Sequence, residues 1–165
     1  RQISACSNTS NKTTETTSND SIPAKEQAVK VEFSDENLNL IYADYLTLKD
    51  ALVATNFDEA TKAAQKLNQT LKSSDQSLQD DAAKIAEAKE IGAQRKVFTT
   101  LSNQLIALFK KSELKVGKVF VQHCPMANEG EGGDWLSSEN KIQNPYYGSE
   151  MMECGAVIEE INSTK

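Results

Sequence analysis

The stretch Val97-Phe98-Thr99-Thr100-Leu101-Ser102-Asn103-Gln104-Leu105-Ile106-Ala107-Leu108-Phe109 (residues 97–109) decides the fold. Its apolar side chains recur at steps of three and four residues, the spacing of one face of an amphipathic helix. The expected inward face consists of Phe98, Leu101, Leu105 and Leu108, widened by Val97, Ile106 and Phe109. This is the strongest helix signal in the chain.

Three further periodic stretches precede it. The first begins near Ser34, an N-cap candidate followed by acidic residues that suit the positive end of a helix dipole. The second restarts at Asn56, where Glu59 stands as in a capping box, and the third runs from about Ser77 to Glu90. Their apolar positions are Leu38, Ile41, Tyr45, Leu48 and Leu52, then Ala60, Ala63, Ala64, Leu67 and Leu71, then Leu78, Ala82, Ile85 and Ala88. With short connections, these stretches predict an antiparallel bundle of three or four helices.

The chain changes character at Lys115. Residues 116–122 are β-branched and aromatic enough to predict a short strand. Residues 127–150 hold four of the seven glycines together with three aromatic residues, so we expect a long structured loop there. Residues 156–161 are expected to form a closing strand or a final helical turn. The expected fold class is therefore mainly α, a helical bundle followed by a C-terminal structured loop with short β-strands.

The 165 residues suffice for one domain with its own core. We expect residues 33–162 to be that domain, with residues 116–162 as its functional segment. Residues 1–32 are mostly polar and predict a disordered tether. Within the tether, Ile3-Ser4-Ala5-Cys6 is similar to the end of a bacterial lipoprotein signal. This predicts a lipid anchor at Cys6 and an oxidising compartment, and the alternative is a chance cysteine in a tail.

Composition excludes several classes of function. The net charge of -6 argues against nucleic acid as a partner, because phosphate binding needs a basic face. No apolar run reaches the roughly 18–20 residues that span a bilayer, so a membrane is expected as a partner only through a lipid on Cys6. The sequence does not predict an enzyme, because His123 and Cys124 would face apart in an extended segment and no Cys-x-x-Cys motif is present.

Sulfur is concentrated in one segment of the chain. All three methionines and two of the three cysteines lie between residues 124 and 154, and the only histidine, His123, precedes the first of these cysteines. Pro125 favours an extended conformation for Cys124. Cys124 and Met126 are then expected to share a face, while His123 points to the other side.

The second sulfur pair is Met151 and Cys154, which are three residues apart. One helical turn would place them on a common face, with Met152 pointing elsewhere. Two facing pairs of thiolate and thioether ligands suit Cu(I), because soft ligands select soft metals. Zinc is less suitable, because its structural sites use four Cys or His ligands. His123 is a secondary candidate ligand.

The same two cysteines have an alternative role. Cys124 and Cys154 could form a disulfide that closes a loop of about thirty residues, which would contribute roughly 3.5 kcal/mol in the chain-entropy model. The metal-binding and disulfide states could also interconvert with redox condition. The cysteines alone leave both possibilities open.

Residues 121–127, 134–137 and 142–148, with Met151 and Cys154-Gly155, resemble a bacterial periplasmic domain of unknown function. That domain occurs alone, as a lipoprotein-like protein, or fused to the C-terminus of membrane-fusion (Cus-type) adaptors of copper and heavy-metal efflux pumps. Residues 45–52 and 94–102 are similar to its helical part, so the resemblance covers roughly residues 36–160. It implies Cys124, Met126, Met151 and Cys154 as motif residues, with His123 beside them.

The resemblance and the sulfur cluster together give the expected function. They predict a lipid-anchored protein of the periplasm or cell surface that binds Cu(I) in copper or heavy-metal handling. A metal-efflux adaptor or a metallochaperone would be its protein partner. The alternative is an interaction or structural module without metal, whose C-terminal loop is closed by a disulfide between Cys124 and Cys154.

Overall fold

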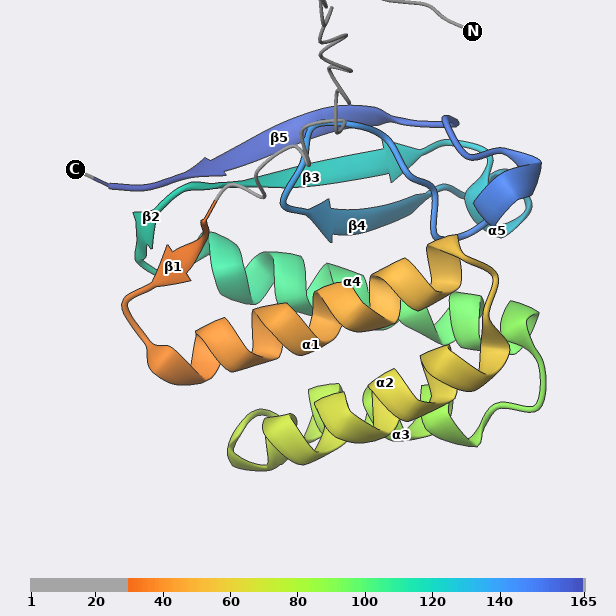
Figure 1. Cartoon of the computed structure of the whole chain (residues 1–165), viewed down its shortest axis with the longest axis horizontal. Coiled ribbons are helices and arrows are strands. Elements are labelled where there is room, and N and C mark those ends of the chain that lie inside the picture. Colours follow the sequence, from red (N-terminus) through yellow and green to blue (C-terminus); the bar gives the residue numbers. More distant parts are fainter. Residues whose placement is uncertain (1–29, 165) are drawn as a thin grey trace, which may run out of the picture.

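Helices stack beneath a small sheet in the computed structural model, which describes residues 30–164. Figure 1 shows the sheet on top, α1 and α4 directly beneath it, and α2 and α3 in the layer below. The elements are β1 (Glu32–Phe33), α1 (Glu36–Val53), α2 (Phe57–Thr70), the 3-10 helix η1 (Leu71–Ser73), α3 (Gln76–Glu87), α4 (Ile91–Lys110), β2 (Leu114–Val116), β3 (Lys118–Cys124), α5 (Ala127–Gly130), β4 (Gly133–Ser137), the 3-10 helix η2 (Gly148–Glu150) and β5 (Ala156–Asn162). The chain is mainly helical, with its longer strands in the C-terminal region, as predicted.

The predicted tether over residues 1–32 lies mostly outside the residues that the structure describes. Cys6 and the rest of residues 1–29 lie outside them. Glu32, one residue before the predicted domain boundary at residue 33, belongs to β1 and pairs with Val116. Across residues 30–164, none of the helices combines the length and the apolar character needed to cross a membrane.

Polar caps set where the helices begin. The Asn56 side chain accepts the N–H of Glu59 at 3.1 Å, which confirms the predicted cap of the second helix. The first helix is capped by Asp35, not Ser34, because the Asp35 carboxylate accepts an N–H of the first turn. The third helix ends at Glu87, almost a turn earlier than expected.

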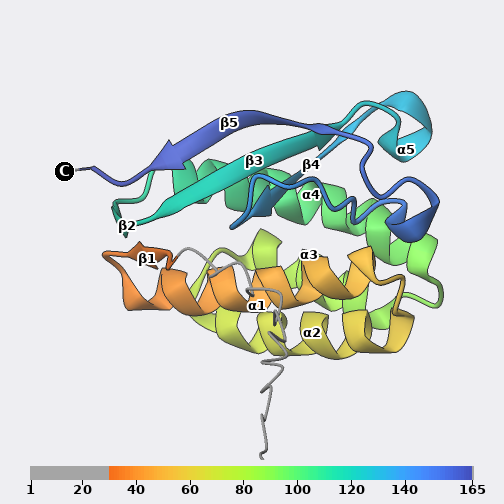
Figure 2. The same cartoon turned by 45° about the horizontal axis from the view of Figure 1, so that its top comes forward.

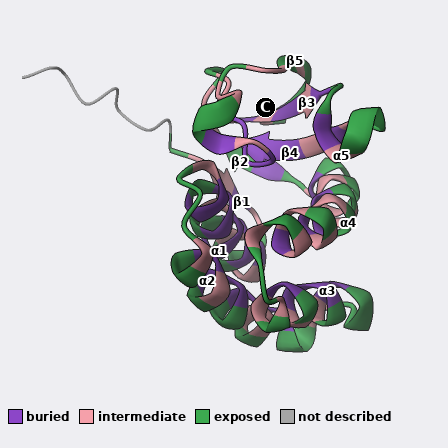
Figure 3. Ribbon diagram, turned by 90° about the vertical axis from the view of Figure 1, so that its right-hand side faces the viewer, coloured by how far each residue is buried: buried purple, intermediate pink, exposed green. Residues whose placement is uncertain are grey.

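Sequence periodicity correctly predicts most of the core between the helices. Phe98, Leu101 and Leu105 are fully buried on α4, but Phe109 takes the buried position expected for Leu108, which is half-buried. The alanine face of α2 is buried as well, and small side chains allow the neighbouring helices to approach closely. In Figure 3 the buried residues line the facing sides of the helices and the sheet above them.

The prediction of a loop over residues 127–150 is partly wrong, because this segment contains the strand β4. β4 returns antiparallel along β3, and β5 pairs with the other side of β3, so the sheet order is β4-β3-β5. The reversal before β4 uses left-handed backbone at Asn128, Glu129, Gly130 and Gly132. Glycine adopts this conformation easily, so the glycines that suggested a loop instead make a tight turn. Of the two alternatives expected for residues 156–161, a closing strand or a final helical turn, the strand is correct, because β5 occupies this segment.

An aromatic column joins the sheet to the helices. Ring centroids lie 5.4 Å apart for Tyr45 and Phe98, 5.8 Å for Phe98 and Tyr146, and 6.1 Å for Tyr146 and Trp135. Aromatic pairs of this geometry contribute about 0.5–1.5 kcal/mol each beyond the area they bury. The Tyr45 hydroxyl also accepts the N–H of Leu136 on β4 at 3.1 Å. The C-terminal segment is therefore anchored to the helical core and does not form a separate unit.

Candidate functional site

The two C-terminal cysteines meet because β3 and β5 are neighbours. Cys124 is the last residue of β3, and Cys154 lies two residues before β5 begins. His123 pairs with Ala156 across the two antiparallel strands, so the next residues outward face each other at the same end of the sheet. Figure 2 shows this end of the sheet, where the turn with α5 lies near the turn that leads into β5.

The Cys124 and Cys154 sulfur atoms lie 2.8 Å apart, and both thiols are free. Cys124 is fully buried, whereas Cys154 is half-buried. The hydrogen bond with Cys124, followed by burial, raises the pKa of the Cys154 thiol, and the N–H of Met126 acts in the opposite direction. A raised pKa keeps the Cys154 thiol protonated at neutral pH, so metal binding there must release a proton.

Met126 is near the thiol pair, but not in the way the sequence predicted. β3 ends at Cys124, and Met126 has helical φ and ψ angles of -91° and -11° in the turn that follows. The alternation of an extended strand therefore does not extend to Met126, and that part of the prediction is wrong. Met126 is 54% exposed, and its backbone lies near enough to Cys154 to lower the pKa of that thiol. The role of its thioether as a ligand stays a prediction.

Met151 is joined to Cys154 by a tight turn. The N–H of Cys154 donates to the Met151 carbonyl at 3.1 Å, but Met151 has φ -146° and ψ 57°, so this is not the expected helical turn. The Met151 carbonyl is nevertheless held against the backbone of Cys154. Met152 lines a cavity next to α1. This agrees with the expectation that Met152 points elsewhere.

His123 points to the face of β3 opposite to Cys124, as expected for consecutive residues of a strand. Its Nδ1 lies 2.6 Å from Oδ1 of Asp134, its register partner on β4. A carboxylate on one ring nitrogen fixes the imidazole and is the usual companion of a histidine that binds a metal through its other nitrogen. Asp134 had no predicted role, because its pairing with His123 depends on β4, which was not predicted.

The loop that contains Asn144, Tyr146 and Tyr147 positions the backbone on both sides of the thiol pair. The fully buried Asn144 side chain donates to the Cys154 carbonyl at 2.8 Å and accepts the N–H groups of Tyr146 and Tyr147 at 2.8 and 3.1 Å. The Tyr147 hydroxyl donates to the Met126 carbonyl at 2.6 Å. The loop therefore positions the turn on each side of the sulfur atoms.

Arg95 fastens this loop to the helices. Its guanidinium donates to the Pro145 carbonyl at 2.8 Å, to the Leu52 carbonyl at 3.0 Å and to the Thr55 hydroxyl at 3.1 Å. Burial lowers the pKa of Arg95, but an arginine stays charged at any physiological pH. Gly148 lies against the same group, because a Cβ there would collide with the Thr55 hydroxyl. The sequence resemblance contains these residues, but their contacts could not be read from spacing alone.

The donor set is small. Within residues 30–164, no group of three or more His, Cys, Asp or Glu side chains could hold a metal ion. The thiol pair could therefore either bind a soft metal together with thioether ligands or form a disulfide.

The helical part of the chain is similar to a known family. No curated protein and no solved structure matches the chain. The segment matched by a family model begins inside α1 and ends directly before β3, so it does not include the thiol pair. Over residues 41–117, the chain matches the model of a family described as Protein of unknown function (DUF3347), and this helical part is therefore similar to a domain of unknown function.

Proposed function

We propose that this protein binds Cu(I) as cargo at the Cys124–Cys154 pair and takes part in copper or heavy-metal handling or efflux. One observation carries the proposal: two free thiols, thirty residues apart in sequence, converge to 2.8 Å at one end of the sheet. The turns on either side of this pair carry Met126 and Met151. A pair of thiols with thioethers close by is a ligand set that selects Cu(I).

The donor chemistry fits a soft metal better than a hard one. No third His, Cys, Asp or Glu joins the pair within the described part of the chain. The soft side-chain donors closest in sequence to the pair are thioethers, and thioethers are not usual ligands of zinc. Met126 is the first candidate, because it follows Cys124 by two residues, its backbone influences the pKa of the Cys154 thiol, and Met126 is exposed.

Metal binding requires a small opening of the pair. Bonds of about 2.3 Å to a tetrahedral metal hold two sulfur atoms roughly 3.8 Å apart, so the sulfurs must separate by about 1 Å. Cys154 is the half-buried partner and lies in a turn before β5, whereas Cys124 is fixed in β3. We therefore expect Cys154 to move on binding.

The second candidate function is an interaction or structural module closed by a Cys124–Cys154 disulfide. The 2.8 Å separation favours it, because the thiols need little movement to reach the bond length of about 2.05 Å. The pair would lose two protons and two electrons to a thiol oxidant. The metal-binding function requires both cysteines to be available as thiols in the freshly purified protein, whereas the second function requires them to be joined in a disulfide.

The deciding experiment is a Cu(I) titration of the reduced full chain against a competing chelator. We expect Cys124→Ser to weaken binding at least a hundredfold, and Met126→Leu with Met151→Leu to weaken it at least tenfold. Met152→Leu is the matched control and should change nothing, because Met152 lines the cavity beside α1. Equal affinity of the wild type and Cys124→Ser would contradict the metal proposal.

A thiol count on fresh protein addresses the second candidate. No free thiol at Cys124 and Cys154, even after purification with copper present, would favour the disulfide function.

The remaining parts of the proposal rest on the sequence resemblance. It supports a periplasmic or cell-surface location, a lipid anchor at Cys6, and a metal-efflux adaptor or metallochaperone as partner. No catalytic step is included.

A further inference from the structure

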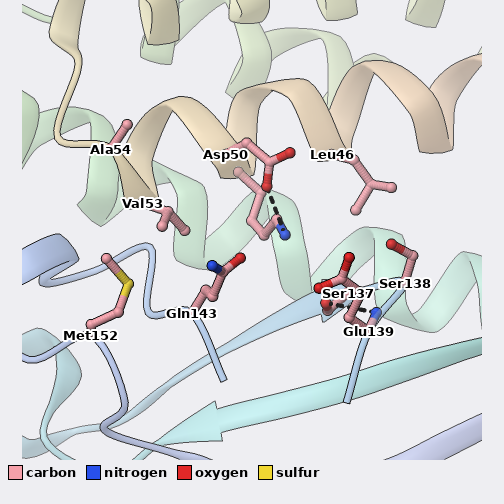
Figure 4. Close-up of a pocket in the computed structure, with 10 residues that line it drawn as sticks. Leu46, Asp50, Val53, Ala54, Ser137, Ser138, Glu139, Gln143 and Met152 are labelled. Carbon is pink, nitrogen blue, oxygen red and sulfur yellow. Dashed lines mark hydrogen bonds and ion pairs between the residues drawn. The ribbon is translucent and has the colours of Figure 1, made fainter. Parts of the chain in front are cut away.

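A second site lies away from the thiol pair, between α1 and the segments on either side of residues 140–142. A cavity of about 320 Å³ is present there, near the lower end of the 300–1,000 Å³ typical of small-molecule sites. Figure 4 shows that Leu46, Asp50 and Val53 line it from α1, while Ser138, Glu139, Gln143 and Met152 line it from the opposite side. Two parts of the chain that are far apart in sequence thus line the same cavity.

A buried lysine gives this cavity its chemistry. The Lys49 side chain is only 7% exposed, and its ammonium lies 2.8 Å from the carboxylate of Asp50, which is 65% exposed. Among residues 30–164 this is the only polar partner of Lys49. An ammonium has three N–H donors, so two are left for a molecule in the cavity. A buried cation without its full set of partners is costly, so an acceptor in the cavity would be favoured.

The charges around the cavity exclude a simple anion as its best ligand. Lys49 supplies one positive charge, and Asp50 and Glu139 supply two negative charges, so the lining carries a net charge of about -1 at neutral pH. A carboxylate alone would meet Lys49 but also two carboxylates. A ligand that carries an ammonium as well as a carboxylate would satisfy both signs of charge.

The rest of the lining adds a preference for an apolar group. Leu46, Val53 and Met152 contribute hydrocarbon and thioether surface. The Gln143 side chain points toward α1 in Figure 4 and offers both a donor and an acceptor. Polar groups of both signs beside an apolar wall are the usual make-up of a site for a small amphipathic molecule.

We propose that this cavity binds a zwitterion of amino-acid size with an apolar side chain. Its carboxylate accepts the free N–H donors of Lys49, its ammonium lies between Asp50 and Glu139, and its side chain packs on Leu46 and Val53. The proposal is independent of the metal-binding proposal, because it uses neither cysteine.

The test is a titration of the 15N-labelled full chain, followed by NMR, with L-leucine as the probe. We expect saturable shifts at Ser138 and Gln143. Two matched probes keep the leucine side chain but lack one charge each: 4-methylpentanoate lacks the ammonium, and 3-methylbutylamine lacks the carboxylate. Both should bind at least tenfold more weakly than leucine. Absence of saturable shifts with leucine, or equal binding of either analogue, would overturn the proposal.

Variants assign the contacts. Lys49→Met and Glu139→Gln should each weaken leucine binding at least tenfold, and Lys72→Met, an exposed lysine outside the cavity lining, should leave it unchanged. Because Lys49 is buried, its replacement could disturb folding. Glu139 is only half-buried, so the Glu139→Gln result and the two analogues decide the question in that case. Unchanged binding in Glu139→Gln would remove the ammonium subsite.

Discussion

At the scale of single residues, the thiol pair is placed mainly by groups that contain no sulfur. Asn144 holds the carbonyl of Cys154 and the N–H groups of two residues in its own loop. It is fully buried, so water cannot replace any of these hydrogen bonds. The geometry of Cys154 therefore depends on the amide of Asn144, which both donates and accepts.

Replacing Asn144 by Asp tests this dependence. A carboxylate still accepts from Tyr146 and Tyr147, but it cannot donate to the Cys154 carbonyl and is itself buried. We expect the reduced protein to lose about 2–4 kcal/mol of unfolding free energy, because a buried acceptor is left unpaired and a charge is buried. Urea denaturation measures the loss. Asn140→Asp makes the same chemical change at an exposed position of this loop and should stay within about 0.5 kcal/mol; equal losses in both variants would contradict the positioning role.

At the scale of elements, two tyrosines on α1 have opposite environments. The Tyr45 hydroxyl lies 2.8 Å from the Ser102 hydroxyl on α4 and accepts the N–H of Leu136 on β4 at 3.1 Å. The Tyr42 hydroxyl is also buried but has no hydrogen-bond partner among the described residues. The first hydroxyl connects three elements, whereas the second is buried without compensation.

The same Tyr→Phe change should therefore have opposite effects at the two positions. Tyr45→Phe leaves a buried N–H on β4 unpaired and should lower the free energy of unfolding by about 1–3 kcal/mol. Tyr42→Phe removes an uncompensated hydroxyl and should be neutral or stabilising by up to about 1 kcal/mol. Both values follow from urea denaturation at pH 7. Comparable destabilisation in both variants would show that the hydrogen bond to β4 is not what Tyr45 contributes.

Elements that depend on local sequence could be predicted, whereas elements that depend on long-range pairing could not. Local signals sufficed for the helices: the periodicity of residues 97–109 and the cap at Asn56 depend on neighbours only three or four residues away. β4 was missed because its pairing depends on left-handed backbone at Asn128 and Glu129, and neither residue type requires that conformation. Without β4, the His123–Asp134 contact could not be anticipated.

At the scale of the whole molecule, the composition of the sulfur segment could be read from the sequence, but its internal geometry could not. Clustering of residue types is visible in a sequence, and it pointed to Cys124 and Cys154. Their approach to 2.8 Å results from β3 and β5 being neighbours in the sheet, which is a long-range property of the fold. Met126 and Met151 both lie in turns whose φ and ψ angles residue spacing does not determine.

The aromatic core also determines how the whole molecule responds to alkaline pH. Burial raises the pKa of Tyr42, Tyr45 and Tyr146 above the ordinary value of about 10. Above pH 10 the unfolded chain therefore loses protons that the folded protein keeps, so the free energy of unfolding falls as the pH rises. Each tyrosine contributes a slope of up to about 1.4 kcal/mol per pH unit, and this slope is absent well below pH 10.

Urea denaturation from pH 8 to pH 11 at constant ionic strength measures this slope. Tyr42→Phe should reduce the slope above pH 10 by up to about 1.4 kcal/mol per pH unit, because one of the three protons is no longer lost on unfolding. Lysines and cysteines titrate equally in the wild type and in Tyr42→Phe, so the difference between the two slopes reports the contribution of Tyr42. Absorbance at 295 nm gives an independent check, because these three rings should ionise only when the protein unfolds. Ionisation of all three near pH 10 in the folded protein, or an unchanged slope in Tyr42→Phe, would contradict the coupling between burial and alkaline stability.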